Sequence, residues 1–83
     1  MMEPEARLRA LIARRANLDP AAVDLDARWR ALGFDSLDLL DLLVACEQEF
    51  AITIDDLAAV RLRCGRDIAD YIRRAQAGAP APG

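Results

Sequence analysis

The chain has 83 residues, of which 54% are hydrophobic and only four are aromatic, so it allows one small domain with a mainly aliphatic core. Its net charge is −3, but residues 35–56 contain seven acidic and no basic residues. Such a concentrated acidic segment argues against a nucleic-acid ligand and favours a partner protein with a basic surface. A solvated helix face is the alternative explanation.

The composition also excludes several kinds of active site. Without histidine the chain forms no Ser–His or Cys–His pair, and without lysine it forms no Schiff base. Its two cysteines, Cys46 and Cys64, fit neither a metal-ligand spacing nor a disulfide framework, which favours a reducing cytoplasm. The longest apolar run, residues 37–46, contains two aspartates and is too short to span a bilayer. We therefore expect a cytoplasmic protein that is not an enzyme and binds neither metal nor membrane.

The first helix is predicted to begin at Pro4 and to end near Asn17, because proline suits a first turn and asparagine suits a helix end. Its apolar stripe consists of Leu8, Leu11 and Ile12. A long first loop follows over residues 18–34, with a short helical turn expected around residues 20–23. Trp29 in this loop is predicted to cover the core, with contact to a partner protein as the alternative.

The central helix is predicted to start at Asp35 or Ser36 and to reach Phe50, because its apolar residues recur three and four positions apart. One apolar stripe is predicted to line the core and consists of Leu39, Leu42, Leu43, Cys46 and Phe50. A second stripe, Leu37, Leu40 and Val44, is flanked by Asp38, Asp41 and Glu47. An apolar stripe with acidic edges predicts a surface that partners bind.

A shorter helix is predicted after the central one. The segment Ile52-Thr53-Ile54 has strand propensity but no second strand to pair with, so it is predicted to be a loop. Asp55 or Asp56 then caps a helix that is predicted to run through Leu57, Val60 and Leu62 and to end at Cys64-Gly65.

The last helix is predicted from about Asp67 to Ala77. Residues 78–83 contain only Gly, Ala and Pro and are predicted to be a disordered tail, or alternatively the stub of a linker. Residues 1–77 would then form the domain. The predicted fold class is all-α, a small four-helix bundle with three longer helices, one short helix and a long first loop.

The stretch Leu32-Gly33-Phe34-Asp35-Ser36-Leu37 resembles the attachment motif of acyl carrier proteins, in which Asp-Ser-Leu opens the second helix. The resemblance covers residues 8–72, because four further features fall where the family places similar residues. These features are Glu47-Gln48-Glu49-Phe50, Ile52-Thr53-Ile54, Asp56 and Asp70-Tyr71-Ile72. The chain departs from the family at Phe34, where fatty-acid carriers more often have Ala, at Gln48, where many members have Glu, and at Asp55, where many have Pro. The departure at Phe34 favours polyketide-type or other specialised metabolism.

The resemblance implies that Ser36, the only serine, carries covalent 4′-phosphopantetheine, transferred from coenzyme A by a separate phosphopantetheinyl transferase. The arm would hold acyl groups as thioesters for polyketide, fatty-acid or related specialised biosynthesis. Three alternatives stay open: a peptidyl or aminoacyl carrier, a helical adaptor with no arm, and a Ser36 or Asp35 that serves only as a helix N-cap.

The implied partners are the transferase and acyl-transferring, condensing or ligase enzymes with basic docking patches, and the chain is expected to be a monomer. The partner face is predicted to consist of Asp35, Leu37, Asp38, Leu40, Asp41, Val44, Glu47 and Asp56. A basic edge formed by Arg61, Arg63 and Arg66 is expected beside this face.

Overall fold

The computed structural model describes residues 3–77, which form four α-helices and two 3-10 turns. In chain order these elements are α1 (Pro4–Ala16), η1 (Pro20–Ala22), η2 (Trp29–Leu32), α2 (Ser36–Phe50), α3 (Asp56–Ala59) and α4 (Gly65–Ala77). The only β-type pairing among residues 3–77 is an isolated antiparallel bridge between Arg28 and Cys64. The predicted all-α fold, with three long helices and one short helix, is therefore confirmed. The predicted tail lies outside the described residues.

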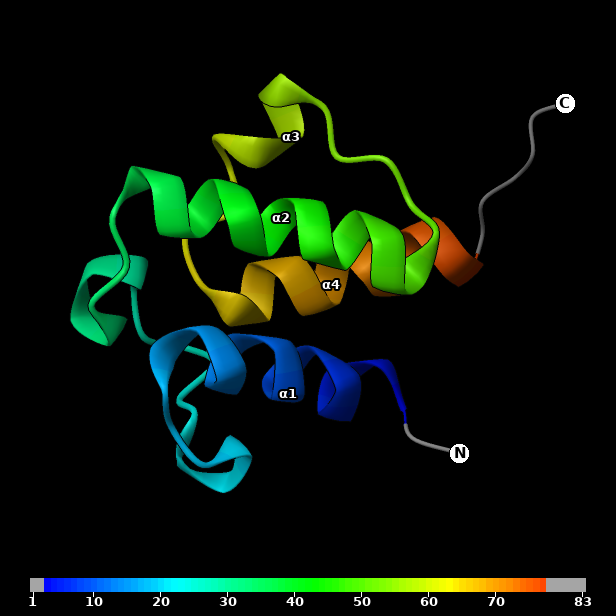
Figure 1. The fold of residues 1–83 in the computed structure, drawn as a ribbon. Helices are drawn as coiled ribbons and strands as arrows, with labels where there is room; N and C mark the ends of the chain where they lie inside the picture. The colour runs from blue at the N-terminus through cyan, green and yellow to red at the C-terminus, as the bar shows by residue number, and fades with distance from the viewer. Residues whose placement is uncertain (1–2, 78–83) are drawn as a thin grey trace, which may run out of the picture.

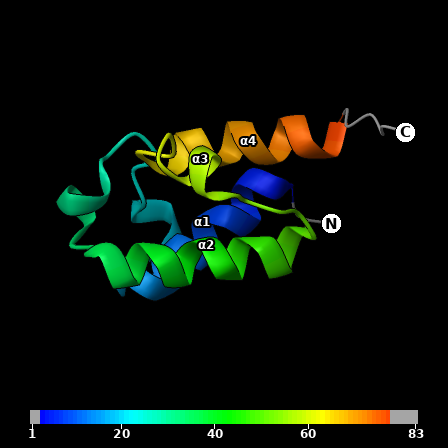
Figure 2. The same cartoon turned by 90° about the horizontal axis from the view of Figure 1, so that it is seen from above.

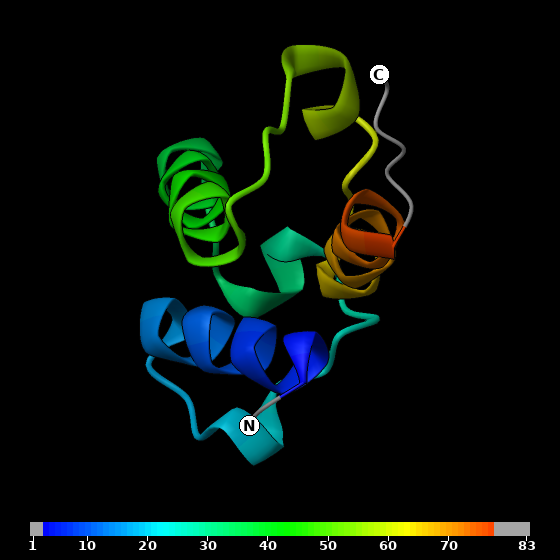
Figure 3. The same ribbon diagram turned by 90° about the vertical axis from the view of Figure 1, so that its right-hand side faces the viewer.

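Three long helices surround the core. α2 and α4 run side by side in the same direction, and α1 runs back across them (Figure 1, Figure 2). α1 packs on both α2 and α4. α3 lies on the side of α2 and α4 that is opposite α1, as Figure 3 shows. The start of α2 therefore lies at the end of the molecule away from the start of α1 and the end of α4 (Figure 1).

α1 has the limits that its sequence predicts. Pro4 lies in its first turn, and Asn17 ends it in the left-handed conformation, with φ of 60° and its backbone N–H donating to the carbonyl of Ala13. Arg7 joins α1 to the end of α2, since its guanidinium lies 2.8 Å from the Glu49 carboxylate and 4.7 Å from the Phe50 ring centroid. The buried residues of α1 are Leu8, Ile12 and Ala13.

Trp29 fastens the long first loop to the core. The residue is 8% exposed, its ring centroid lies 5.7 Å from that of Phe34, and its indole N–H donates a hydrogen bond of 2.8 Å to the Leu62 carbonyl. The prediction that Trp29 covers the core is confirmed. The expected helical turn also forms, as η1, and the Asp19 side chain accepts a hydrogen bond from the Ala21 backbone N–H at its start.

The two apolar stripes of α2 decide which side of the helix faces the core. In the core stripe Leu39 is partly buried and the other members are fully buried: Leu42, Leu43, Cys46 and Phe50. Cys46 is 0% exposed, and this burial raises the pKa of its thiol to about 12. A thiol with so high a pKa is protonated at neutral pH and unreactive, so Cys46 serves as a small core residue.

The expected end of the short helix at Cys64-Gly65 is wrong. α3 stops at Ala59. In the next residues the backbone hydrogen bonds span three positions and not four: Arg61 N–H donates to the Ala58 carbonyl (3.0 Å) and Leu62 N–H to that of Ala59 (3.1 Å). The physical reason is Leu62, whose side chain is buried and whose carbonyl accepts the Trp29 hydrogen bond. Cys64 also forms the antiparallel bridge with Arg28, which requires an extended backbone and so excludes a helix that reaches this residue.

α4 begins at Gly65, two residues earlier than predicted, so this glycine starts a helix and does not end one. A Cβ atom at Gly65 would lie 2.8 Å from Leu25 Cδ2 and 3.0 Å from Ile12 Cδ1, so a larger residue would force these two core side chains to shift. The Asp67 carboxylate accepts a hydrogen bond of 2.8 Å from the Arg63 backbone N–H and closes the helix start. α4 buries Ile68, Ala69 and Ile72.

Candidate functional site

Ser36 is the first residue of α2 and is exposed. The preceding residues fix its position: Gly33 reverses the chain at the end of η2 with φ of 84°, and Phe34 is buried at 8% exposure. A left-handed φ at this position favours glycine, which explains the residue type at the turn. Ser36 is therefore held on a rigid base while its own side chain faces solvent.

Asp35, and not Ser36, is the N-cap of α2. The Asp35 carboxylate accepts a hydrogen bond of 2.8 Å from the Asp38 backbone N–H, and the Asp38 carboxylate accepts one of 3.1 Å from the Asp35 backbone N–H. This reciprocal pair is a capping box made with aspartate. The hydrogen bond from Asp38 lowers the pKa of Asp35, so its carboxylate is ionised at neutral pH. Among the described residues, the Ser36 hydroxyl has no hydrogen-bond partner.

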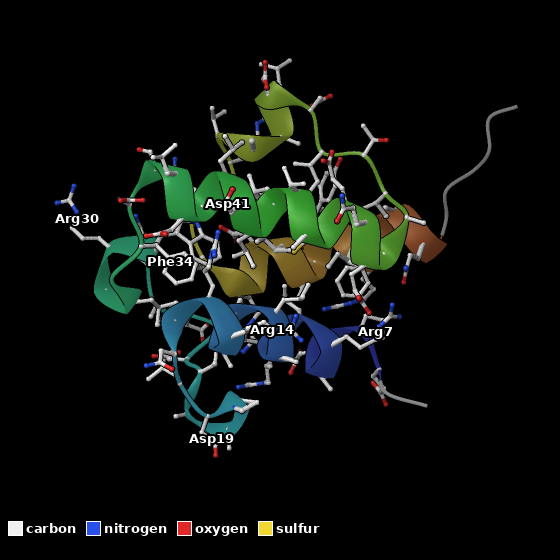
Figure 4. All side chains as sticks on the ribbon, viewed as in Figure 1. Arg7, Arg14, Asp19, Arg30, Phe34 and Asp41 are labelled. Atoms are coloured by element: carbon white, nitrogen blue, oxygen red, sulfur yellow. The ribbon has the colours of Figure 1, made fainter. Side chains whose placement is uncertain are left out.

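An open depression surrounds Ser36. Its lining residues come from η2, the turn and the first part of α2: Trp29, Arg30, Phe34, Asp35, Ser36 and Leu39. Phe34 lies beneath the start of α2, and Arg30 extends outward from η2 beside it (Figure 4). The depression thus combines a packed aromatic base with one exposed cationic side chain at its edge.

The second apolar stripe of α2 is exposed as predicted. Leu37 is 71% exposed, Leu40 56% and Val44 43%. The sequence did not reveal that α3 and its C-cap continue this pattern, with Leu57 at 74% and Val60 at 73% exposure. Large apolar residues that stay exposed on neighbouring elements are typical of a binding surface. The spacing of these residues could not predict their exposure, because a helix of unknown length has no defined outer face.

The acidic residues of the predicted partner face are less free than their sequence suggests. Asp35 and Asp38 close the capping box, and Asp41 forms an ion pair with Arg15 of α1. Glu47 accepts a hydrogen bond of 2.8 Å from the Ile54 backbone N–H, whereas Asp56 is exposed at the start of α3. The face is therefore both acidic and anchored to the scaffold.

The expected basic edge is partly wrong. Arg66 lies 3.2 Å from the Asp26 carboxylate and 3.4 Å from that of Glu5, so it belongs to a cluster with α1 and the first loop. These carboxylates raise the pKa of Arg66, first through the hydrogen bond to Asp26. Arg61 and Arg63 remain exposed in the segment after α3.

No helix within residues 3–77 has the length and apolar character that crossing a bilayer requires. In the same part of the chain, no three His, Cys, Asp or Glu side chains gather into a group that could hold a metal ion.

Comparison with known proteins gives one consistent family. The family model for the phosphopantetheine attachment site matches residues 6–72, a range that contains Ser36. The chain is 33% identical over 75 residues to an acyl carrier protein of Phaeodactylum tricornutum (strain CCAP 1055/1), covering 89% of this chain and 99% of that protein. It is 40% identical over 68 residues to an acyl carrier protein of Treponema pallidum (strain Nichols), covering 81% and 87% respectively. An acyl carrier protein of Onion yellows phytoplasma (strain OY-M) is 38% identical over 69 residues, covering 82% and 91%.

Proposed function

The chain belongs to the acyl carrier protein family, whose members carry covalent 4′-phosphopantetheine, and we propose that Ser36 is the residue to which this arm is attached. The observation on which the proposal rests is that the only serine of the chain is exposed at the start of α2 and has no structural task. Because Asp35 supplies the cap, modification of the Ser36 hydroxyl removes no hydrogen bond from the fold.

The charges around Ser36 favour a phosphodiester on the side of Arg30 and oppose it on the side of the Asp35 carboxylate. The positive end of a helix stabilises a nearby anion by about 0.3–1 kcal/mol. The Asp38 N–H is already taken by Asp35, so fewer donors are free than an uncapped helix start would offer. The Asp35 carboxylate beside Ser36 repels the phosphate, whereas Arg30, at the edge of the same depression, attracts it. The arm would therefore be directed to the Arg30 side of the depression.

We propose that the arm holds acyl intermediates as thioesters and presents them to enzymes of fatty-acid, polyketide or related specialised biosynthesis. A short tether gives the bound group a high effective concentration at whichever enzyme is docked. The chain itself then acts as carrier and enzyme substrate, not as catalyst. Phe34, the residue that favoured polyketide-type metabolism, is buried against Trp29 and so acts in packing, which leaves fatty-acid biosynthesis equally open.

The proposed partners are a phosphopantetheinyl transferase and acyl-transferring, condensing or ligase enzymes with basic docking patches. Support comes from the exposed stripe of Leu37, Leu40 and Val44 beside the acidic residues of α2. A few apolar anchors with complementary charge allow fast, weak association, which suits a carrier that must be released. We also propose that the chain acts as a monomer in the cytoplasm, where its two free thiols stay reduced.

Mass spectrometry after incubation with coenzyme A and a phosphopantetheinyl transferase tests the attachment site. The wild-type chain should gain one phosphopantetheine, and Ser36→Ala should gain none while its circular dichroism stays unchanged. Thr53→Ala, which removes the only threonine, is the matched control and should be modified like wild type. Modification of Ser36→Ala would refute the site, and an unmodified wild type would favour the helical adaptor. Loading of the arm by an amino acid but not by an acyl group would favour a peptidyl or aminoacyl carrier.

A further inference from the structure

A second open groove adjoins the Ser36 depression on the α3 side. Both hollows are lined by Trp29, Arg30 and Leu39, so they form one continuous surface. The second groove is bounded by α3 and the segment that follows it, through Ala59, Val60, Leu62 and Arg63, and by Arg28 before η2. A group attached to Ser36 therefore reaches this groove without crossing any other element.

The rim of the groove is basic and, within residues 3–77, its guanidinium groups form no ion pair, although the Asp67 carboxylate accepts a hydrogen bond from the Arg63 backbone N–H. Arg28, Arg30 and Arg63 are exposed, and no carboxylate of the described residues lies within 4.0 Å of their guanidinium groups. Arg7 and Arg66 do pair with carboxylates. Three arginines outside this groove also form no ion pair among the described residues, but they do not gather around one hollow with the rim arginines: Arg14, Arg61 and Arg74. Three unpaired cations around one hollow favour an anionic occupant.

The floor of the groove is apolar and its inner wall is fixed. Leu39, Ala59 and Val60 supply aliphatic surface, and Val60 is 73% exposed. Trp29 forms the inner wall, and its hydrogen bond to the Leu62 carbonyl and its contact with Phe34 keep the indole in place. A shallow apolar floor under a cationic rim suits a short aliphatic chain that ends in an anion, whereas a neutral alkyl chain would leave the rim unpaired.

We propose that this groove binds the acyl group carried on Ser36 when that group ends in a carboxylate, through Arg28 and Arg63 at the rim and Leu39 and Val60 at the floor. This inference rests on the proposed attachment of the arm at Ser36. Exposed ionic contacts are weak, each changing the occupancy by about two- to fivefold. Such weak contacts suffice here, because the tether supplies a local concentration in the millimolar range (~1 mM), and they leave the cargo free to depart.

The single tryptophan of the chain gives a direct test. The protein is loaded, through the transferase, with an arm that carries a glutaryl group or a pentanoyl group, which have the same carbon chain with and without a terminal carboxylate. We expect the glutaryl form to shift the NMR signals of the Trp29 indole N–H and the Val60 amide several-fold more than the pentanoyl form. Raising the salt from about 0.1 M to 1 M should remove the difference, because the Debye length falls from about 10 to 3 Å.

Arg28→Gln combined with Arg63→Gln should make the glutaryl and pentanoyl shifts equal. The matched control is Arg14→Gln combined with Arg74→Gln, which removes two exposed arginines outside this groove and should keep the glutaryl shift. Equal shifts for the two cargoes in wild type, or a glutaryl shift that survives in the Arg28 and Arg63 variant, would overturn the proposal. The proposal also fails if that variant loses affinity for an acidic partner protein while its cargo shifts stay unchanged.

The two proposals fail in different ways. A wild-type chain that gains no arm refutes the attachment at Ser36, and the cargo site with it. A chain that is loaded at Ser36 but shows no carboxylate-dependent shift refutes the cargo site alone.

Discussion

α4 places Ile68 and Ile72 in the core, where both are 0% exposed, whereas α3 leaves Leu57 74% exposed and Val60, the residue that ends it, 73% exposed. The two helices follow each other in the chain and both contain large apolar residues. They differ in length, since α4 has 13 residues and α3 has four. A helix of one turn has no continuous stripe with which to cover a core, so its apolar residues remain available to other molecules.

α2 has both kinds of surface on one helix. Its inner stripe, which includes Leu42 and Cys46, is buried, and its outer stripe, Leu37, Leu40 and Val44, is exposed. Buried and exposed apolar residues can therefore lie on two sides of one helix, and not only on different helices. Stability should depend on α1, α4 and the inner side of α2, and binding should depend on α3 and the outer side of α2.

The largest effect is expected from Ile72→Ala. Truncation of a fully buried isoleucine should lower the free energy of unfolding by about 2–5 kcal/mol, since it removes apolar contacts and leaves a cavity. The matched change in α3, Leu57→Ala, should alter it by less than about 0.5 kcal/mol because that side chain is already exposed. Urea denaturation of both variants measures the difference. A Leu57→Ala loss as large as that of Ile72→Ala would show that α3 belongs to the core.

Trp29→Phe should have the next largest effect. It leaves the Leu62 carbonyl without its donor, and a buried unpaired acceptor costs about 1–3 kcal/mol. The same variant should raise hydrogen exchange at the amides between α3 and α4, because Trp29 holds that segment in place. Phe34→Leu, which keeps the hydrogen bond but removes the ring contact, is the control. If exchange rises equally in both variants, packing and not the hydrogen bond fixes the segment.

Asp35→Ala should destabilise the protein by less than Trp29→Phe, and Asp35→Asn by less still, because asparagine also accepts the N-cap hydrogen bond. The pKa of Asp35 is lowered in the folded state, so its contribution is present above the ordinary value of 3.8 and is lost as the pH falls through the lowered value. The stability difference between wild type and Asp35→Asn should therefore shrink on acidification below about pH 4. A difference that is constant from pH 7 to pH 2 would contradict the ionic cap.

The smallest effect on stability is expected from Arg15→Ala, at the contact between α1 and the partner face. Arg15→Ala breaks an exposed ion pair with Asp41, which is worth about 0–1 kcal/mol. Because it frees the Asp41 carboxylate, it should speed association with a transferase that has a basic patch and steepen the salt dependence of the rate. Stopped-flow measurements at several salt concentrations test both expectations.

Reversing the charge of an acidic residue on the same face should have the opposite effect on the association rate. Asp41→Arg should slow association and flatten its salt dependence. Asp38→Arg should do the same but should also destabilise α2, because Asp38 closes the capping box. Rates and salt slopes equal to those of wild type would show that the acidic residues form only a solvated helix face.

Helix ends that carry local signals could be predicted from the sequence. Pro4 and Asn17 delimit α1, and the apolar spacing of α2 decides which side of that helix is buried. Ser36 could be singled out in the same way, from the Asp-Ser-Leu stretch and from its being the only serine. These features depend on residues within one or two turns of each other, so their chemistry can be read along the chain.

The tertiary structure was needed to locate the end of α3 and the start of α4, because Leu62 is fixed by Trp29 and Gly65 by the approach of Leu25. It also decided which charges are free. Arg15 is 26 residues from Asp41 and Arg66 is 40 from Asp26, and no spacing rule predicts pairs at such separations. Contacts between distant residues depend on how the helices pack together, and that packing is settled by the whole core at once.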